Sequence, residues 1–261
     1  MASSARTACA APWRAEFLSH VSQMDSPLCV LSTIRACSPP VPRARTVVFR
    51  GMWCTLTPNP RNPAPQNPPV FESDHLTLTT DARMDKAREI APSLKGGDVP
   101  GTDGGGCFEA VFWAPKVMTQ WRFRGKAYLL GPDVESEDSH AVNVRRALLR
   151  GMRRVGEGDF SWEREVTAHF GNLSPLMRGS FRNPSPGRPI ADGTGEEGLG
   201  LGQRVEDLHD EIARRNFRVV VLVPEEVDKV DLSDAEKGRR WQFRDIGGPE
   251  GSAWEGVEVW P

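Results

Sequence analysis

The feature of this sequence that most limits its fold is the arrangement of its β-prone runs, which form two groups near opposite ends of the chain. The first group has five runs between residues 28 and 130, and the second begins at residue 217 and continues into the C-terminal region. Within the first group only one short helical pattern separates successive runs, whereas parallel strands require long crossover connections. We therefore predict a mainly β fold with α-helices (α+β), in which an antiparallel barrel is closed by C-terminal strands.

Residue types and their periodicity place the individual elements of the first part. An amphipathic helix is predicted at Pro12–Val21, where apolar residues recur at helical spacing. A second helix is predicted at Ala82–Ala91, opened by Asp81 and ended by Pro92. The predicted strands of the first group are Leu28–Ile34, Arg45–Trp53, His75–Thr80, Phe108–Trp113 and Gln120–Leu130.

The middle of the chain has a helical pattern, and β structure returns after it. Helices are predicted at Ala141–Val155, Trp162–Phe170 and Val205–Asn216, with a Pro/Gly-rich loop at Asn183–Gly202. The predicted strands of the second group are Phe217–Val223, Val227–Leu232, Arg240–Phe243 and Trp254–Val259, with a turn at Pro224-Glu225-Glu226. We expect a single domain over residues 1–261, with the barrel formed by 12–131 and 217–261 and a helical and loop insertion at 132–216.

The bulk composition argues against several classes of protein. Of the 261 residues 38% are hydrophobic, enough for a core, while 22 prolines and 25 glycines indicate long irregular connections. The formal net charge of −2 gives no electrostatic reason to expect nucleic acid or an anionic membrane as a partner. No apolar run approaches the roughly 20 residues that cross a bilayer. Met1–Ala11 lacks the apolar segment of a secretory signal, which leaves a short organelle-targeting peptide open.

The cysteines and histidines form no pattern typical of a metal site. The five cysteines are odd in number and have no CxxC spacing, so we expect a reduced intracellular compartment, the cytoplasm. The histidines form no ligand pattern with them, and we expect no metal. The residues concerned are Cys9, Cys29, Cys37, Cys54, Cys107, His20, His75, His140, His169 and His209.

Several loops and one basic helix carry weaker signals. Six prolines in Thr57–Pro69 argue against a strand and mark either an insertion or a docking element for a proline-recognition domain. The run Gly198–Gly202 follows no strand, so we do not expect a nucleotide-binding loop there. The arginines of Ala141–Val155 are expected to form a solvated face, with contact to a phosphate or a partner as the alternative. A further flexible loop is expected at Gly96–Gly106.

The clearest local signal for a binding site is at the end of the predicted strand His75–Thr80. Thr79 and Thr80 place two hydroxyls just before the predicted helix, whose free N–H groups favour an anion. Arg83 and Lys86 are spaced i, i+3, so their cationic heads would share one helix face. Two hydroxyls and two cations beside a helix start predict a phosphate site, with ordinary exposed helix residues as the alternative.

Two further sets of polar residues lie on predicted strands. Arg45 and Arg50 bracket an apolar run, and in a regular strand they point to opposite faces. Both would reach one ligand only across a strand end or a bulge. Gln120 and Arg122 begin a polar row on one face of their strand, opposite Trp121. Taken alone, each set is also explained by polar strand ends or an exposed sheet face.

These signals are joined by a resemblance to a known family. The segments that carry it are RTVVFRG at Arg45–Gly51, LTLTTDARMDKAREI at Leu76–Ile90 and FEAVFWAPKVMTQWRFRGKAYLLG at Phe108–Gly131. In order and approximate spacing they are similar to successive motifs of the pyridoxamine-phosphate oxidase-like family, an FMN-binding split barrel. FRVVVLVPEEVDKVDL and WEGVEVWP, which begin at Phe217 and Trp254, resemble the family's closing strands. LSPLMRGSFRNPSPG, from Leu173, is similar to a divergent branch.

The resemblance implies a split β-barrel that forms a homodimer, with FMN in two clefts at the dimer interface. Arg45, Arg83 and Lys86 would then bind the FMN phosphate. Arg50 would stand near the isoalloxazine ring, where the family usually has lysine, and Gln120 would reach the flavin from the partner subunit. The full set of cofactor-binding residues that the resemblance implies is Arg45, Thr46, Val47, Val48, Arg50, Thr79, Thr80, Arg83, Lys86, Gln120, Arg122 and Arg240.

The sequence also departs from the family in its C-terminal region. Pyridoxal-forming members grip their substrate with an Arg-x-His motif, where this chain has Glu236-Lys237-Gly238, and the flavin-contacting tryptophan has no match near Asp231. We therefore expect FMN-dependent oxidation or reduction of a small amine or another small molecule. No catalytic side chain is assigned, because the cofactor supplies the chemistry. The alternatives are an NAD(P)H-dependent flavin or quinone reductase, a non-catalytic flavin- or haem-binding protein, and an interaction protein that docks through its proline-rich loop.

Overall fold

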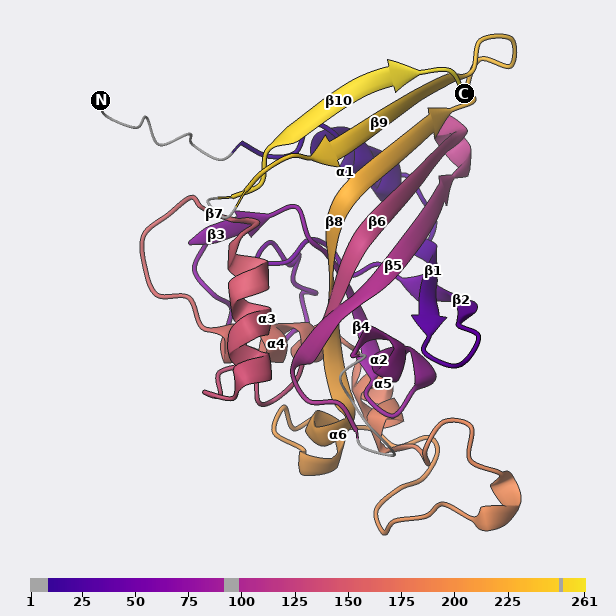
Figure 1. The fold of residues 1–261 in the computed structure, drawn as a ribbon. Coiled ribbons are helices and arrows are strands. Elements are labelled where there is room, and N and C mark those ends of the chain that lie inside the picture. Colours follow the sequence, from indigo (N-terminus) through magenta and orange to yellow (C-terminus); the bar gives the residue numbers. More distant parts are fainter. Residues whose placement is uncertain (1–8, 92–98, 249–250) are drawn as a thin grey trace.

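The computed structural model describes residues 9–91, 99–248 and 251–261 (Figure 1). Residues 1–8 of the N-terminal segment, the helix end expected at Pro92 and the start of the loop expected at Gly96–Gly106 lie outside this part. The helices are α1 (Arg14–Ser22), α2 (Asp85–Ile90), α3 (Ser139–Leu149), α4 (Trp162–Gly171), α5 (Pro175–Gly179) and α6 (Glu211–Asn216). Three short 3₁₀ helices are η1 (Pro115–Val117), η2 (Ser180–Arg182) and η3 (Ile190–Asp192).

One large antiparallel sheet organises the fold, with the strand order β10-β9-β8-β6-β5-β1-β2 and with β4 paired to β8. Its strands are β1 (Leu28–Arg35), β2 (Val41–Val48), β4 (Leu76–Asp81), β5 (Asp103–Ala114), β6 (Thr119–Leu130), β8 (Phe217–Asp231), β9 (Arg239–Asp245) and β10 (Trp254–Val259). A second, two-stranded sheet pairs β3 (Phe71–Ser73) with β7 (Met152–Arg154). The predicted mainly antiparallel β fold with helices is therefore confirmed.

The sheet curls into a split barrel. Residues just beyond the edge strand β2 form hydrogen bonds with β4 and with His75 just before it. The Arg50 amide donates to the carbonyl of Thr77 on β4 at 2.8 Å, and the Thr77 amide donates back to Gly51 at 2.9 Å. Two residues further, the Trp53 amide donates to His75 at 2.9 Å. These bonds hold residues 50–53 against β4, although the strands themselves do not form a continuous ring. They also fix where the Arg50 side chain leaves the backbone.

Aromatic side chains fill the barrel interior, and α1 covers one end of it. Phe17 of α1 is fully buried and makes edge-on contacts with Phe123 and Phe112, whose ring centroids lie 4.7 and 5.0 Å away. Burying each such ring is worth about 1.5–3 kcal/mol. The helix predicted at Pro12–Val21 therefore packs on the barrel as its apolar spacing indicates.

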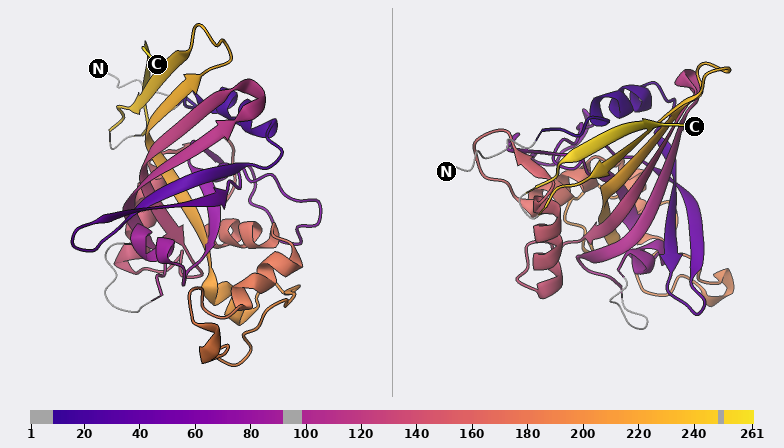
Figure 2. Two further views of the ribbon diagram at one scale, coloured as in Figure 1. Left: turned by 90° about the vertical axis from the view of Figure 1, so that its right-hand side faces the viewer. Right: turned by 45° about the horizontal axis from the view of Figure 1, so that its top comes forward.

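Strand β8 joins this interior to a second apolar cluster beneath the helices. Val220 and Leu222 face the barrel core, while their neighbours Val219 and Val221 pack with Phe170 and residues of α3, α4 and α6. This alternation is the ordinary period of a strand that is buried on both faces. Figures 1 and 2 show α3, α4, α5 and α6 at the end of the strands away from the β9–β10 hairpin, whereas α1 lies beside that hairpin.

Three predicted helix boundaries are wrong, and each error has a local cause. The helix predicted to reach Val155 ends at Leu149, because residues 152–154 pair with β3 and Gly151 passes directly over the ring of His75. The helix predicted from Val205 begins only at Glu211, where the Asp210 side chain accepts the Ala213 amide at 2.8 Å. The third error, at α2, changes the site and is described with it.

The turn predicted at Pro224 is also wrong, because β8 runs through it without a break. Pro224 lies opposite Gly125, where the β6–β8 register shifts by one residue. A Cβ at Gly125 would collide with the Val223 carbonyl, so glycine permits the close approach of the two backbones. By contrast, the segment Thr57–Pro69 contains no helix or strand, as its prolines predict. Among the described residues, no helix is long and apolar enough to span a membrane.

Candidate functional site

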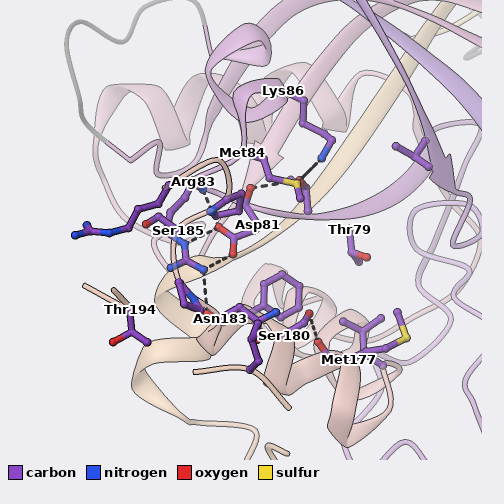
Figure 3. A pocket seen from close by; sticks show the side chains of 18 of the residues that line it. Thr79, Asp81, Arg83, Met84, Lys86, Met177, Ser180, Asn183, Ser185 and Thr194 are labelled. Atoms are coloured by element: carbon purple, nitrogen blue, oxygen red, sulfur yellow. Dashed lines mark hydrogen bonds and ion pairs between the residues drawn. The ribbon is translucent and has the colours of Figure 1, made fainter. Parts of the chain in front are cut away.

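A cavity of about 830 Å³ lies between the β2–β4 end of the barrel and the segment 173–201 (Figure 3). One wall comes from the last residues of β2, from Arg50 and from the turn that joins β4 to α2. The opposite wall comes from α5, η2 and the irregular loop that follows. The predicted residues that line it are Thr46, Val47, Val48, Arg50, Thr79, Thr80, Arg83 and Lys86. The structure thus brings together three separate sequence motifs.

Arg50 is a partly buried cation that has no acidic partner among the described residues. Its Nε atom is buried and makes no hydrogen bond, and desolvation by burial alone lowers the pKa of its guanidinium. The ring of His169 is fully buried and stacks on Trp53, with the ring centroids 5.8 Å apart and an interplanar angle of 11°. Burial, with a smaller effect of Arg50, lowers the pKa of His169 to about 3, so this ring stays neutral. Because an unpaired charge away from water is costly, Arg50 is poised to bind an anion.

Lys86 provides a second cation on the same wall. Its Nζ donates to the Thr80 hydroxyl at 3.0 Å and also contacts the sulfur of Met84 (Figure 3). Burial, followed by repulsion from Arg45, lowers the pKa of Lys86 from its ordinary value. No carboxylate in the described part of the chain forms an ion pair with it. The Thr80–Lys86 pair therefore presents an ammonium and a hydroxyl side by side, a suitable arrangement for phosphate oxygens.

Arg83 lies at the cavity, but its charge is already compensated. It binds the Asp81 carboxylate through Nη2 to Oδ2 at 2.6 Å and Nε to Oδ1 at 2.9 Å (Figure 3). The Arg83 amide donates to the same carboxylate, so Asp81 closes a turn and does not cap a helix. Helix α2 begins only at Asp85, and the prediction that Arg83 and Lys86 share one helix face is wrong. With only six residues, α2 also has too little dipole to carry the argument from a helix start.

Arg45 does not line the cavity. Its guanidinium pairs with Glu89 of α2 at 2.6 Å and also donates to the Thr33 hydroxyl. Glu89 is almost fully buried, so Arg45 is needed to compensate its charge within the fold. Because β2 ends at Val48, Arg50 lies beyond the strand and is free of the alternation that would set it opposite Arg45.

The three remaining predicted residues lie elsewhere, on the face formed by β6, β8 and β9. Arg122 and Arg240 line a separate hollow of about 210 Å³ and both pair with Asp228, at 3.2 and 2.7 Å. Gln120 lies two residues before Arg122, on the strand position opposite Val230. Within one protomer, none of the three lines the cavity.

The apolar wall of the cavity is the part that the sequence did not reveal. Leu173, Met177, Phe181, Ile190 and Leu201 all lie on it, and Arg188 is its one cation among the described lining residues. They come from short helices and an irregular loop, which have no periodicity to read. The only sequence signal was the similarity of LSPLMRGSFRNPSPG to a divergent branch of the family, and this segment supplies much of the wall.

The comparison with known families agrees with this geometry. Residues 10–131 match the family model described as pyridoxamine 5'-phosphate oxidase, FMN-binding domain. This segment is similar to the FMN-binding domain of that family. The match confirms the resemblance that the sequence motifs indicated, and with it FMN as the cofactor of the family domain. It also contains the whole β2–β4–α2 wall of the cavity.

Two relatives extend the comparison beyond the FMN-binding domain. A Saccharomyces cerevisiae protein described as uncharacterised is 22% identical over 278 residues, which cover 84% of this chain and 88% of the relative. The solved structure of a pyridoxamine 5'-phosphate oxidase-related, FMN-binding protein from Nostoc punctiforme superposes with a TM-score of 0.59 at 20% identity. That alignment covers 96% of this chain and 98% of the other. At this identity the likeness supports the fold.

Proposed function

We propose that the cavity between the β2–β4 wall and the segment 173–201 binds FMN, and that the protein is an FMN-dependent oxidoreductase acting on a small molecule. The observation that carries this proposal is Arg50, a partly buried cation with an unpartnered Nε on the wall of a large cavity. The residues around it fit the cofactor. Thr80 and Lys86 suit a phosphate, and Val47 and Val48 offer apolar contact to a flat ring.

FMN, when bound, supplies the two-electron chemistry, and the protein contributes binding, orientation and electrostatics. Lys86 and Thr80 hold the phosphate end of the cofactor. Arg50 offers a permanent positive charge to the ring system, because arginine stays protonated where lysine would lose its proton on burial. Burial of Arg50 away from water strengthens the electrostatic effect that its charge would have on the ring.

The assembly and the location are part of the same proposal. The family resemblance suggests a homodimer in which Gln120 reaches the partner's cofactor. We give Arg122 and Arg240 no share in binding the phosphate, because Asp228 compensates both charges. The shared strand β8 supports one domain over both apolar clusters. Cys29, Cys37, Cys54 and Cys107 form no disulfide in the described part of the chain, which supports a reducing compartment such as the cytoplasm.

One observation favours a second candidate, a flavin-binding protein without turnover. Among the described residues that line the cavity, Asp81 is the only carboxylate, and it pairs with Arg83. None of these lining residues is a histidine. Lys86, assigned to the phosphate, is then the remaining proton-transfer group on the described wall. Flavin oxidation of a substrate that needs no general acid or base is compatible with this lining, and so is cofactor storage.

The absorption spectrum of the purified protein, with mass spectrometry of the molecule released on denaturation, tests the cofactor. A flavin spectrum with FMN released supports the proposal. A colourless protein that takes up no added FMN contradicts it. Anaerobic bleaching of bound FMN by amines, acids or reduced nicotinamides then separates an oxidoreductase from a non-catalytic binder.

A matched pair of lysine variants tests the assigned wall. Lys86→Met is expected to weaken FMN binding about tenfold, because it removes a charge-assisted contact to the phosphate. Lys116→Met removes an exposed lysine that pairs with Asp25 at 2.8 Å on a distant turn, and it should leave FMN affinity unchanged. Equal effects of the two substitutions on the Kd measured by calorimetry would contradict the placement of the phosphate.

A further inference from the structure

The two walls of the cavity differ in a way that one cofactor does not explain. The β2–β4 wall carries the hydroxyls, Arg50 and Lys86. The wall from 173–201 is mostly apolar, and several of its side chains are left open to solvent. Ile190 is 97% exposed, Leu201 is 81% exposed and Met177 is 42% exposed. Figure 1 shows the loop around η3 extending away from the body of the protein. Apolar side chains that gather at a cavity mouth are typical of a binding surface.

The size of the cavity leaves room for a second ligand. About 830 Å³ is near the upper end of the roughly 300–1,000 Å³ that small-molecule sites occupy. A cofactor whose phosphate lies at Lys86 and Thr80 occupies the polar wall. The remaining volume then lies against the apolar wall, next to Met177, Phe181 and Pro186.

The charge of the lining indicates what that second ligand carries. The described lining residues include four cations, Arg50, Arg83, Lys86 and Arg188, and one carboxylate, Asp81. The net charge of the wall is therefore three positive. A phosphate monoester such as FMN contributes about −1.5 to −2 at neutral pH, so about one positive charge remains uncompensated. A protonated amine would add to this excess, whereas a singly charged acid would neutralise it.

Arg188 is the cation that lies on the apolar wall. Its Nη2 donates to the Asp192 carbonyl at 3.0 Å, and the loop folds around it because Gly195, at φ 90°, passes close to the guanidinium. A side chain at Gly195 would crowd Arg188 Nη1 at 3.3 Å. No carboxylate in residues 9–91, 99–248 and 251–261 forms an ion pair with Arg188. The loop thus orients a cation and leaves its charge available.

We infer that the cavity binds, beside FMN, a flat and mostly apolar molecule with a single acidic group, and that Arg188 is the residue that selects this acid. The inference rests on the proposed function, because it takes the polar wall to be filled by FMN. It narrows the small amine or other small molecule expected from the sequence to an aromatic or similarly flat carboxylic acid. The apolar wall contacts the ring of the ligand, and Arg188 grips the carboxylate with its planar fork.

Three naphthalene probes with the same ring and different charge test the inference on the full chain loaded with FMN. The probes are 2-naphthoate, 2-naphthalenemethanol and 2-naphthylmethylammonium, and their affinities are measured by calorimetry and by the change in flavin absorbance. We expect 2-naphthoate to bind at least tenfold more tightly than the ammonium probe, with the alcohol between them. Equal affinities, or tighter binding of the ammonium probe, would overturn the inference.

A pair of arginine variants assigns the effect to one residue. Arg188→Gln should weaken 2-naphthoate about tenfold while leaving the alcohol and FMN itself unchanged. Arg204→Gln is the matched control, because Arg204 is an exposed arginine just after the segment 173–201 and does not line the cavity. If both variants have the same effect on 2-naphthoate, Arg188 is not the selecting residue. Failure of the chain to take up FMN overturns the proposed function together with the inference. Normal uptake of FMN without preference for 2-naphthoate overturns the inference alone.

Discussion

Two groups of basic side chains lie in hollows of this protein, and they differ in what compensates their charge. On the β6–β8–β9 face, Arg122 and Arg240 both pair with Asp228, and the hollow is small. In the large cavity, Arg50 and Lys86 form no ion pair with any carboxylate of the described chain, and Arg50 has a buried Nε without a hydrogen bond. The charges of the first group are paired within the fold, although the Nε atom of Arg122 is likewise buried without a hydrogen bond.

The difference shows which basic cluster is suited to an added anion. A cation that already has a carboxylate partner gains little from a ligand, because the ligand must compete with that partner. Arg50 gains more from a bound anion. Folding has already removed its guanidinium from water, and no described carboxylate offsets that free-energy cost. Sequence alone gives Arg50 and Arg122 equal standing, as polar residues on predicted strands. The carboxylates that distinguish them come from distant positions such as Asp228.

The largest effect expected from the difference between the two basic groups is on the affinity for FMN. Arg50→Met should weaken FMN binding by about 30- to 100-fold, because it removes a charged contact from a water-poor site. Arg122→Met removes an arginine of the paired group and should change the Kd by less than about threefold. Fluorescence titration of FMN with both variants measures the ratio. Comparable losses would mean that the Asp228 pair does not isolate Arg122 from the cofactor.

The next effect is on stability, where the two groups should respond with opposite signs. Asp228→Asn leaves Arg122 and Arg240 facing each other without their carboxylate and should lower the free energy of unfolding by about 1–2 kcal/mol, a value reduced for partial exposure. In the cofactor-free protein, Arg50→Met removes an unpaired, partly buried charge. This substitution should raise the free energy of unfolding by about 1 kcal/mol. Urea unfolding of both variants measures the two changes, and a loss of stability in Arg50→Met would argue that Arg50 has a structural partner.

The smallest effect concerns the neutral ring beside Arg50. His169 is buried with a pKa lowered to about 3, so it binds a proton on unfolding at any pH between that value and its ordinary 6.5. The unfolded state then holds more protons, and stability is present above pH 6.5 and is lost as the pH falls. Between pH 7.5 and 5.5 the loss due to His169 should be about 1 kcal/mol.

His169→Gln checks this pH dependence without relying on absolute stability. The variant should lose less of its unfolding free energy between pH 7.5 and 5.5 than the parent protein, whatever its stability at pH 7.5. His75, whose pKa is lowered to about 4 by burial, remains in both proteins and contributes equally. If the parent protein and His169→Gln lose the same unfolding free energy between pH 7.5 and 5.5, His169 already takes up its proton in the folded protein over this range.

The sequence predicted much of the barrel because alternation is a local property. Trp121 and Phe123 are buried while Arg122 and Arg124 are not, as the alternating pattern of their strand indicates. Strand β7 was not predicted, because the sequence placed Met152–Arg154 in the helix expected at Ala141–Val155, and only pairing with β3 makes them a strand. The continuity of β8 through Pro224 depends on Gly125, about a hundred residues earlier.

The candidate site was predicted only in part, because the sequence shows local motifs but not the contacts between distant residues. Thr79, Thr80, Lys86 and Arg50 lie within the family motifs, and all of them line the cavity. Arg45 carries the same charge in the same motif, but the buried Glu89 holds it away from the cavity. Neither that ion pair nor the apolar wall of 173–201 has a periodic signal, because both are products of tertiary packing.

The central claim, that FMN occupies the cavity with its phosphate at Lys86 and Thr80, is tested most directly by a crystal structure of the protein saturated with FMN. The account predicts phosphate oxygens within hydrogen-bonding distance of Lys86 Nζ and the Thr80 hydroxyl, with Arg50 in contact with the cofactor. A phosphate bound instead by Arg122 and Arg240 of the same protomer, with their contacts to Asp228 broken, would contradict it.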